Sequence, residues 1–273
     1  MTFHDLSFLH YPTFFSKKQR LWHALQDSLR EARRSAHIIA DSNFTKGDLV
    51  EAGVDEQKIS VVYPGIDKSF YRIGVDDPRR MAFRKKYGIH YPFLLSLGTL
   101  EPRKNIPAAI RAFTALKRAP QWKDLRFVIA GSPGWLYHDT LKEARVSAVR
   151  HDIVFLGPMA DSERILLYNE ARAFIYPSFF EGFGFPPLEA QACGCPVVVS
   201  NRTSLPEIIA DSGIAADPWN ITLLAESLER VLEEGATREK LIIAGYQNAA
   251  RFTWKNAAES VRKILENVHH KTP

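Results

Sequence analysis

The sequence contains only two cysteines and no long apolar run. Cys193 and Cys195 are separated by one residue, a spacing too short for an ordinary disulfide, and no histidine or cysteine cluster accompanies them as a zinc site would require. We therefore predict two buried thiols in a reducing compartment. No apolar run approaches the roughly 18 to 20 residues that span a bilayer, and the opening MTFHDLSFLHYPTFF lacks the basic start and apolar core of a signal peptide. These absences favour a cytoplasmic protein.

Signatures of nucleic-acid binding are also missing. The chain has 273 residues and a formal net charge of +5, a balance that suits a phosphate-bearing ligand, an anionic membrane surface or a nucleic acid. It contains no zinc-finger, homeodomain or RNA-recognition signature and no aromatic-flanked basic repeats, so we expect no nucleic-acid partner. The composition, 45% hydrophobic and 25% charged, is typical of a globular protein with a large core.

Short β-rich runs alternate with amphipathic helical runs, a pattern typical of an α/β protein with parallel sheets. Up to residue 72 the sequence predicts strands near HDL, HIIADS and ISVVYP, with helices at 17–34 and 43–52. The stretch YPGIDKSFYRIGVDDP then places a domain boundary near residue 72, because it is rich in Pro, Gly and Asp and has no periodicity. A doubly wound lobe usually has about 100 residues or more, so we expect this first lobe to be incomplete, with a part missing upstream.

The segment 73–253 predicts a complete second lobe. A helix at 78–87 is followed by helices that alternate with five predicted strands: FLLSLG, LRFVIAG, DIVFLG, AFIYPS and PVVVS. Helices at 219–234, 236–250 and 254–268 close the chain. The sequence therefore predicts two unequal α/β lobes and a final helical segment.

One candidate for a ligand-binding or catalytic motif is SFFEGFGFPPLEAQACGCPVVVS. Gly182, Gly184 and Pro186 interrupt any continuous helix between Glu181 and Glu189, so Glu181 lies on a loop and Glu189 near the opening turn of the next helix. The glycines allow backbone amides to approach a ligand, and the helix N-terminus favours a phosphate. The two carboxylates suit sugar or ribose hydroxyls. The alternative is a strained turn in which one glutamate complements the helix dipole.

A second motif is SLGTLEPRKNIPAAI, in which a buried strand ends at Gly98 and a helix begins near Asn105. The loop between them carries Glu101, Arg103 and Lys104. Two cations at the carboxyl end of a parallel strand lie where a diphosphate would bind, with arginine as a planar fork and lysine as a point charge. The alternative is a solvated loop. Cations near a helix start are mildly unfavourable, which favours the functional interpretation.

Together these stretches resemble the retaining glycosyltransferases of the GT-B fold, family four, also called glycosyl transferases group 1. The resemblance covers nearly the whole chain, through ISVVYPGID, GTLEPRKNI, LRFVIAG, VFLGPMADSERILLYNEA, YPSFFEGFGFPPLEAQACGCPVV and SNRTSLPEI. It implies an α/β GT-B fold with two Rossmann-like lobes. Residues 1–72 would be the last part of the N-terminal, acceptor-side lobe. Residues 73–253 would be the nucleotide-sugar-binding lobe, and 254–273 a helix crossing back to the first lobe.

The resemblance also implies roles for individual residues. Glu181 and Glu189 match the family's E-x7-E pair, with Glu181 as a catalytic candidate facing the donor hexose and Glu189 facing the nucleotide ribose. A histidine at a strand end, taken alone, is more often structural or simply exposed, but His4 matches a histidine that the first lobe of family members presents to the donor sugar. By the same resemblance, five residues would bind the donor diphosphate: Arg103, Lys104, Gly182, Phe183 and Gly184. Many members have Gly-Arg where this chain has Gly98 and Thr99, so Arg103, beside Lys104, would carry that charge alone.

The implied reaction moves a hexose from a nucleoside diphosphate sugar, GDP-mannose favoured, to a hydroxyl of a glycan or lipid-linked acceptor with retention. The resemblance implies neither a cofactor nor a metal, and residues 1–273 alone are expected to transfer poorly. Two alternatives stay open. One is a non-catalytic fragment that binds a nucleotide or a partner chain, and the other is a sugar-nucleotide epimerase of related fold.

Residues 17–34 carry an amphipathic pattern. Leu21, Trp22, Leu25 and Leu29 form one helical stripe beneath six lysines or arginines. Such a helix can lie on an anionic membrane surface, which leaves peripheral contact with the cytoplasmic face of the membrane open. Packing of the stripe on its own lobe explains the same pattern and is the interpretation we favour.

Overall fold

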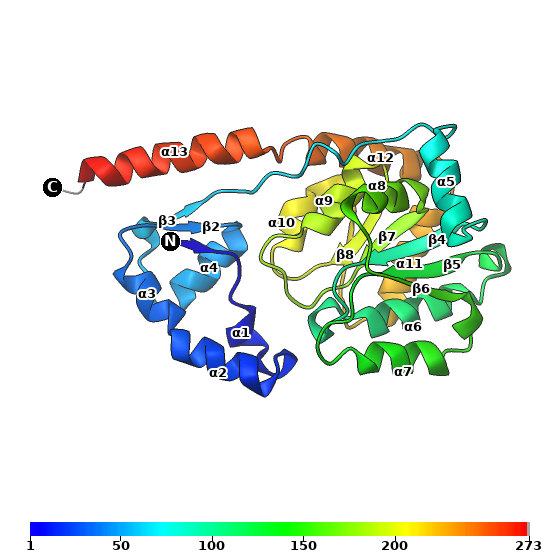
Figure 1. The fold of residues 1–273 in the computed structure, drawn as a ribbon, viewed down its shortest axis with the longest axis horizontal. Helices are drawn as coiled ribbons and strands as arrows, with labels where there is room; N and C mark the ends of the chain where they lie inside the picture. The colour runs from blue at the N-terminus through cyan, green and yellow to red at the C-terminus, as the bar shows by residue number, and fades with distance from the viewer. Residues whose placement is uncertain (272–273) are drawn as a thin grey trace.

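The alternation of strands and helices builds two parallel sheets, which confirms the predicted α/β class (Figure 1). The computed structural model describes residues 1–271. We refer to residues 1–72 as the first lobe and to residues 73–253 as the second lobe. Figure 1 shows the two lobes side by side, joined by an extended segment and by the last helix.

The first lobe contains a three-stranded parallel sheet in the order β1-β2-β3. Its strands are short: β1 (Thr2–Phe3), β2 (Ile38–Ala40) and β3 (Ile59–Val61). The helices between them are α1 (Ser7–His10), α2 (Lys17–Gln26), α3 (Ser28–Arg34) and α4 (Asn43–Glu51). One buried apolar cluster joins the sheet to these helices, with members that include Phe3, Leu6, Ile38, Leu49 and Ile59. Because the strands are so short, burial of this cluster rather than strand pairing holds the lobe together.

The helix predicted at 17–34 is two helices, because the chain breaks at Asp27 in a left-handed conformation with φ 40°. The predicted packing of the stripe on its own lobe is wrong for α2. Leu21, Trp22 and Leu25 are 62%, 55% and 78% exposed. Only Leu29, beyond the break, packs against the core of the first lobe. The change of direction at Asp27 separates the two halves of the stripe, so α2 presents an apolar face to solvent.

The second lobe contains a six-stranded parallel sheet in the order β6-β5-β4-β7-β8-β9. Its strands are β4 (Phe93–Leu97), β5 (Arg126–Ala130), β6 (Ile153–Gly157), β7 (Ala173–Tyr176), β8 (Val197–Ser200) and β9 (Ile214–Ala216). The sequence does not predict β9. Strand order reverses between β4 and β7, and in open parallel sheets ligands bind outside the carboxyl ends of the strands at this reversal. The topology therefore directs attention to the loops that follow β4 and β7.

Helices cover both faces of this sheet, because alternate residues of each buried strand point to opposite sides. Leu94 packs on one face with α6 (Ile106–Leu116), α7 (His138–Val146) and α11 (Ile221–Leu232). Leu95 packs on the other with α5 (Pro78–Tyr87), α8 (Asp161–Glu170), α9 (Phe185–Ala192) and α10 (Leu205–Ile209). Outside α9 lies α12 (Ala236–Ala249). The two apolar layers fix the sheet, and with it the loops at its carboxyl edge.

The chain passes between the lobes twice. The segment 62–77 leads from β3 to the second lobe, and α13 (Trp254–Lys271) returns over the first lobe (Figure 1). Near its end, Ile264 lines a groove with Lys58 and Ala36 of the first lobe. Positions 272 and 273 of the predicted crossing segment lie outside the described residues. Within residues 1–271, no helix combines the length and apolar character needed to cross a membrane.

Candidate functional site

Two loops meet at the carboxyl edge of the second sheet, where strand order reverses. The loop after β4 contains the short 3-10 turn Pro102–Lys104, and the loop after β7 leads to α9. The two are tied together because the backbone N–H of Phe179 donates to the carbonyl oxygen of Arg103 at 2.9 Å. The two motifs predicted from the sequence therefore meet, and Glu101 and Arg103 line a crevice there with Asp5 of the first lobe.

Glu181 is the centre of a network of charged side chains beside this crevice. Arg103 Nη1 donates to one carboxylate oxygen at 2.6 Å and Lys104 Nζ to the other at 2.7 Å. Burial raises the pKa of Glu181, but the two cations outweigh it and hold the pKa at about 2. The site therefore presents a buried, ionised carboxylate between two cations.

The two cations are not an isolated basic pair. Arg103 Nη2 also donates to Glu101 at 2.6 Å, and Lys104 also donates to the hydroxyl of Tyr176. Burial lowers the pKa of Lys104, and Glu181 opposes that effect. The carboxylates of Glu101 and Glu181 thus neutralise both cations in this structure, so an anionic ligand would have to compete with them for the two cations. The sequence places Glu101 in this loop, but only the structure shows its ion pair with Arg103.

The glycine loop, Gly182–Gly184, contacts the first lobe directly. A Cβ on Gly182 would lie 1.7 Å from the carbonyl oxygen of His4, so the backbones approach as closely as glycine allows. Gly184 has φ 118° and immediately precedes α9. The side chain of Phe183 is buried in a separate apolar cluster with Leu188. Of the predicted loop, Phe183 can therefore offer a ligand only its backbone.

The segment after β8 fixes the glycine loop from the other side. Ser204 Oγ donates to the carbonyl oxygens of Glu181 and Phe183, both at 2.8 Å. The Glu181 N–H donates to Thr203 Oγ1 at 3.0 Å. Thr203 itself has φ 57°. The sequence does not single out these two residues, although both lie in the SNRTSLPEI stretch that carries the family resemblance.

Glu189 has its own set of partners, away from the Arg103 and Lys104 pair. It is buried in α9, where it accepts from the hydroxyl of Tyr168 at 2.9 Å and pairs with Arg164. Burial raises the pKa of Glu189, while Arg164 and Tyr168 act against the rise. Both partners lie on α8, within the VFLGPMADSERILLYNEA stretch that carries the family resemblance, but no local pattern pairs them with Glu189. The two carboxylates of the E-x7-E pattern therefore occupy distinct environments.

His4 lies where the first lobe touches the glycine loop. Its side chain is 82% exposed, and Nδ1 lies 2.7 Å from Asp41 Oδ2. Burial raises the pKa of Asp41, and its contact with His4 acts in the opposite direction. Asp41 follows β2, so two strand ends of the first lobe place this pair beside Gly182. The imidazole is therefore oriented by a carboxylate and exposed on the side of the first lobe that faces the glycine loop.

A second contact between the lobes involves Glu207 of α10. Its carboxylate accepts from the backbone N–H groups of Asn43 at 2.7 Å and Phe44 at 3.2 Å, the first residues of α4. The Tyr63 hydroxyl donates to the same carboxylate at 2.6 Å. A side chain of the second lobe thus supplies negative charge to a helix N-terminus of the first.

Known families match both lobes. Residues 80–248 match the family model for glycosyl transferases group 1, and residues 1–70 match the model for glycosyltransferase family 4. This chain belongs to the glycosyl transferases group 1 family. Membership confirms the resemblance of the sequence to glycosyl transferases group 1.

Among proteins of similar sequence, O-antigen chain mannosyltransferase B of Escherichia coli is 33% identical over 260 residues, which are 93% of this chain and 66% of that protein. The serotype-specific mannosyltransferase WbdA of Escherichia coli is 30% identical over 247 residues, 88% of this chain and 30% of WbdA. This chain therefore spans just under two thirds of the first relative and less than a third of the second.

Solved structures of the same fold agree. Sucrose-phosphate synthase from Thermosynechococcus elongatus superposes with a TM-score of 0.80 at 20% identity, over 99% of this chain and 68% of that one. Anabaena HepE, solved with UDP and glucose, has a TM-score of 0.80 at 20% identity, over 97% of this chain and 70% of that one. The GT-B fold predicted for this chain is confirmed.

Proposed function

We propose that the crevice binds a nucleoside diphosphate sugar and supplies the donor side of a hexosyl transfer to a hydroxyl of a glycan or lipid-linked acceptor. The observation that carries the proposal is the ionised Glu181, held between Arg103 and Lys104 beside a helix N-terminus. The cations and the helix N-terminus would stabilise the negative charge that develops on the leaving diphosphate. Glu181 would accept hydrogen bonds from hexose hydroxyls, and Glu189 from ribose hydroxyls.

Retention would follow from front-face attack. The acceptor oxygen forms a bond to the anomeric carbon on the side from which the phosphate oxygen leaves, and the departing phosphate takes the acceptor proton. No protein nucleophile is needed in this scheme. His4, oriented by Asp41, would contact the donor sugar from the first lobe. Because the basic side chains take the part that a divalent cation plays elsewhere, we propose transfer without metal or cofactor.

For the donor we propose GDP-mannose. Mannosyl transfer is in the names of the two Escherichia coli relatives. UDP-glucose is the competing donor, since HepE is solved with UDP and glucose. The two alternatives to transfer differ in their products. An epimerase would convert the nucleotide sugar without an acceptor, and a non-catalytic fragment would bind nucleotide and release no product.

Calorimetry with GDP, UDP and their sugars, with and without EDTA, tests the proposal. Binding of GDP-mannose that survives EDTA and weakens in Lys104→Met is the expected result. Lys86→Met is the matched control, because Lys86 is also paired with a glutamate but is exposed on α5. Binding that disappears on chelation would overturn the metal-free scheme. Equal binding by both variants would remove the crevice as the donor site.

We also propose peripheral contact with the cytoplasmic face of a membrane through α2. Its exposed Leu21, Trp22 and Leu25 lie beside Lys17 and Lys18, a combination that suits the interface of an anionic bilayer. Sedimentation with vesicles of anionic phospholipid should capture the protein, and Leu25→Glu should reduce capture, whereas vesicles of neutral phospholipid should capture little. Equal capture of the wild type by both vesicle types would contradict electrostatic docking.

A further inference from the structure

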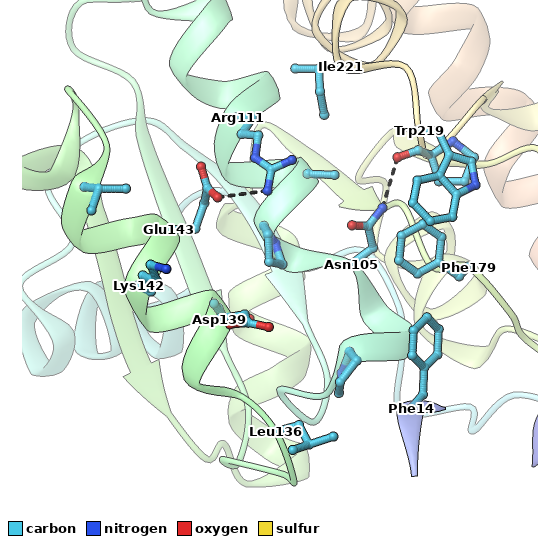
Figure 2. Close-up of a pocket in the computed structure, with 16 residues that line it drawn as sticks. Phe14, Asn105, Arg111, Leu136, Asp139, Lys142, Glu143, Phe179, Trp219 and Ile221 are labelled. Atoms are coloured by element: carbon cyan, nitrogen blue, oxygen red, sulfur yellow. Dashed lines mark hydrogen bonds and ion pairs between the residues drawn. The ribbon is translucent and has the colours of Figure 1, made fainter. Parts of the chain in front are cut away.

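A groove of about 470 Å³ lies on the outer side of the loop that follows β4 (Figure 2). It is lined by the start of α6, by α7 and by the loop that precedes α11, and Phe14 of the first lobe closes one end. Glu181, Lys104 and Glu189 are not among its lining residues. The groove is therefore separate from the donor crevice, although Phe179, next to that crevice, contributes to its wall.

One wall of the groove is aromatic. Trp219 is 63% exposed, and its ring stacks on Phe179 with centroids 4.2 Å apart and planes inclined by 29°. Phe14 continues this wall, with its centroid 5.6 Å from that of Phe179. Stacking on a buried neighbour holds the indole in place while one face stays open. A fixed, exposed aromatic face suits a flat ligand with an apolar side.

The facing wall is polar and carries both signs of charge. Arg111 and Glu143 form an ion pair at 2.9 Å, with Asp139 and Lys142 beside them. Figure 2 shows these four side chains opposite Trp219, Phe179 and Phe14. Two acids and two bases give no net charge, and the carboxylates disfavour a phosphate. Groups that both donate and accept hydrogen bonds match hydroxyls, which do the same.

We propose that this groove is a carbohydrate-binding subsite that holds sugar units of an oligosaccharide. A pyranose has an apolar face of axial C–H groups, which would lie on Trp219, and an edge of hydroxyls, which would face Arg111, Asp139 and Glu143. The volume suits a short oligosaccharide rather than a single sugar. Because Phe179 N–H bonds to Arg103, the groove and the donor crevice share one loop. That the groove holds the acceptor glycan rests on the proposed function, whereas the binding of an oligosaccharide in the groove does not.

Titration of the full chain with an α-linked mannotetraose, in the absence of nucleotide, tests the inference. Wild-type protein should bind the tetrasaccharide more tightly than mannose. Loss of one aromatic stacking contact weakens binding roughly 2- to 12-fold before the lost apolar contact area is counted, and Trp219→Ala should show a decrease of at least that order. Asp139→Asn should weaken binding less. The matched control is Trp22→Ala, since Trp22 is similarly exposed on α2 and lies outside the groove.

The outcomes separate this inference from the proposed function. GDP-mannose binding should be the same in Trp219→Ala and wild type, because the donor residues are untouched. If the wild-type protein bound the tetrasaccharide but no nucleotide, the result would support the groove as a carbohydrate site and reject the proposed donor site. No binding of the tetrasaccharide by wild type, or equal binding by wild type, Trp219→Ala and Asp139→Asn, would overturn the inference. Competition of guanosine for the groove would also overturn it, in favour of base stacking.

Discussion

Removing the Glu207 carboxylate should loosen the contact between the lobes. In the structure this group accepts from two N–H groups at the start of α4, from the Asn43 side chain at 2.9 Å and from the Tyr63 hydroxyl. A hydrogen bond to a charged group contributes about 1.5 to 3 kcal/mol, and a charge at a helix N-terminus about 0.3 to 1 kcal/mol. Because the site is partly exposed and water replaces lost partners, we expect about 2 kcal/mol for Glu207→Ala.

Amide hydrogen exchange in α4 is the direct assay. A loss of about 2 kcal/mol speeds exchange through local opening roughly 30-fold. The exposed Glu259 in α13 provides the control substitution Glu259→Ala, which should leave α4 unchanged.

A titration of Tyr63 reports the same contact independently. Burial and the Glu207 carboxylate together raise the pKa of Tyr63 to about 12. Glu207→Gln should lower that pKa towards 10, visible in the ultraviolet absorbance of the phenolate. Since the folded pKa is raised, stability from this tyrosine is present below about pH 10 and lost as the pH approaches 12. An unchanged Tyr63 titration together with unchanged α4 exchange would refute the contact.

Three further predictions concern the crevice. Glu189→Ala should weaken the binding of GDP and of GDP-mannose alike, whereas Glu181→Ala should weaken the binding of GDP-mannose more than that of GDP. Each loss of binding free energy should be roughly 1.5 to 3 kcal/mol by calorimetry. Equal effects of both substitutions on both ligands would contradict the roles assigned to the two glutamates. The Glu181 pKa of about 2 lies below its ordinary 4.5, so its stabilisation is present above about pH 4.5 and declines as the pH falls through 2; acid unfolding of Glu181→Gln should lack this component. Gly182→Ala should destabilise the protein strongly, because the new Cβ meets the His4 carbonyl, while Gly47→Ala in α4 meets nothing within 4 Å and should stabilise it by about 0.5 to 1 kcal/mol in urea unfolding.

The sequence predicts most of the fold because strand and helix periods are local signals. It does not predict β9 (Ile214–Ala216), because its two alanines give it less β-branched character than the equally short β2 and β3. Nor does it predict the break at Asp27, because nothing in the surrounding helical pattern signals a left-handed residue. Exposure of Leu25 follows from that break and depends on the packing of the whole lobe.

For the site, the sequence predicts the loops and not the partners. Glycines, prolines and cations at strand ends predict that Glu181 and Lys104 lie near a ligand site, because carboxyl ends of parallel strands share one edge. The ion pair between them joins residues 77 positions apart, and no local pattern encodes it. The same holds for Arg164 beside Glu189 and Asp41 beside His4, where tertiary packing selects the partner.

The double passage between the lobes makes the linker dispensable for holding the molecule together. If a protease cleaved the backbone between Tyr71 and Asp77, the two pieces would still be in contact, because Ile66 N–H donates to the carbonyl oxygen of Phe252 just before α13 at 3.0 Å and Glu207 accepts from the start of α4. The two pieces should therefore co-purify after nicking. The two pieces should also associate when they are co-expressed from separate genes, as the halves of a split protein do. Glu207→Ala in the nicked protein would remove one of these contacts, so the two pieces should then separate more readily on a sizing column.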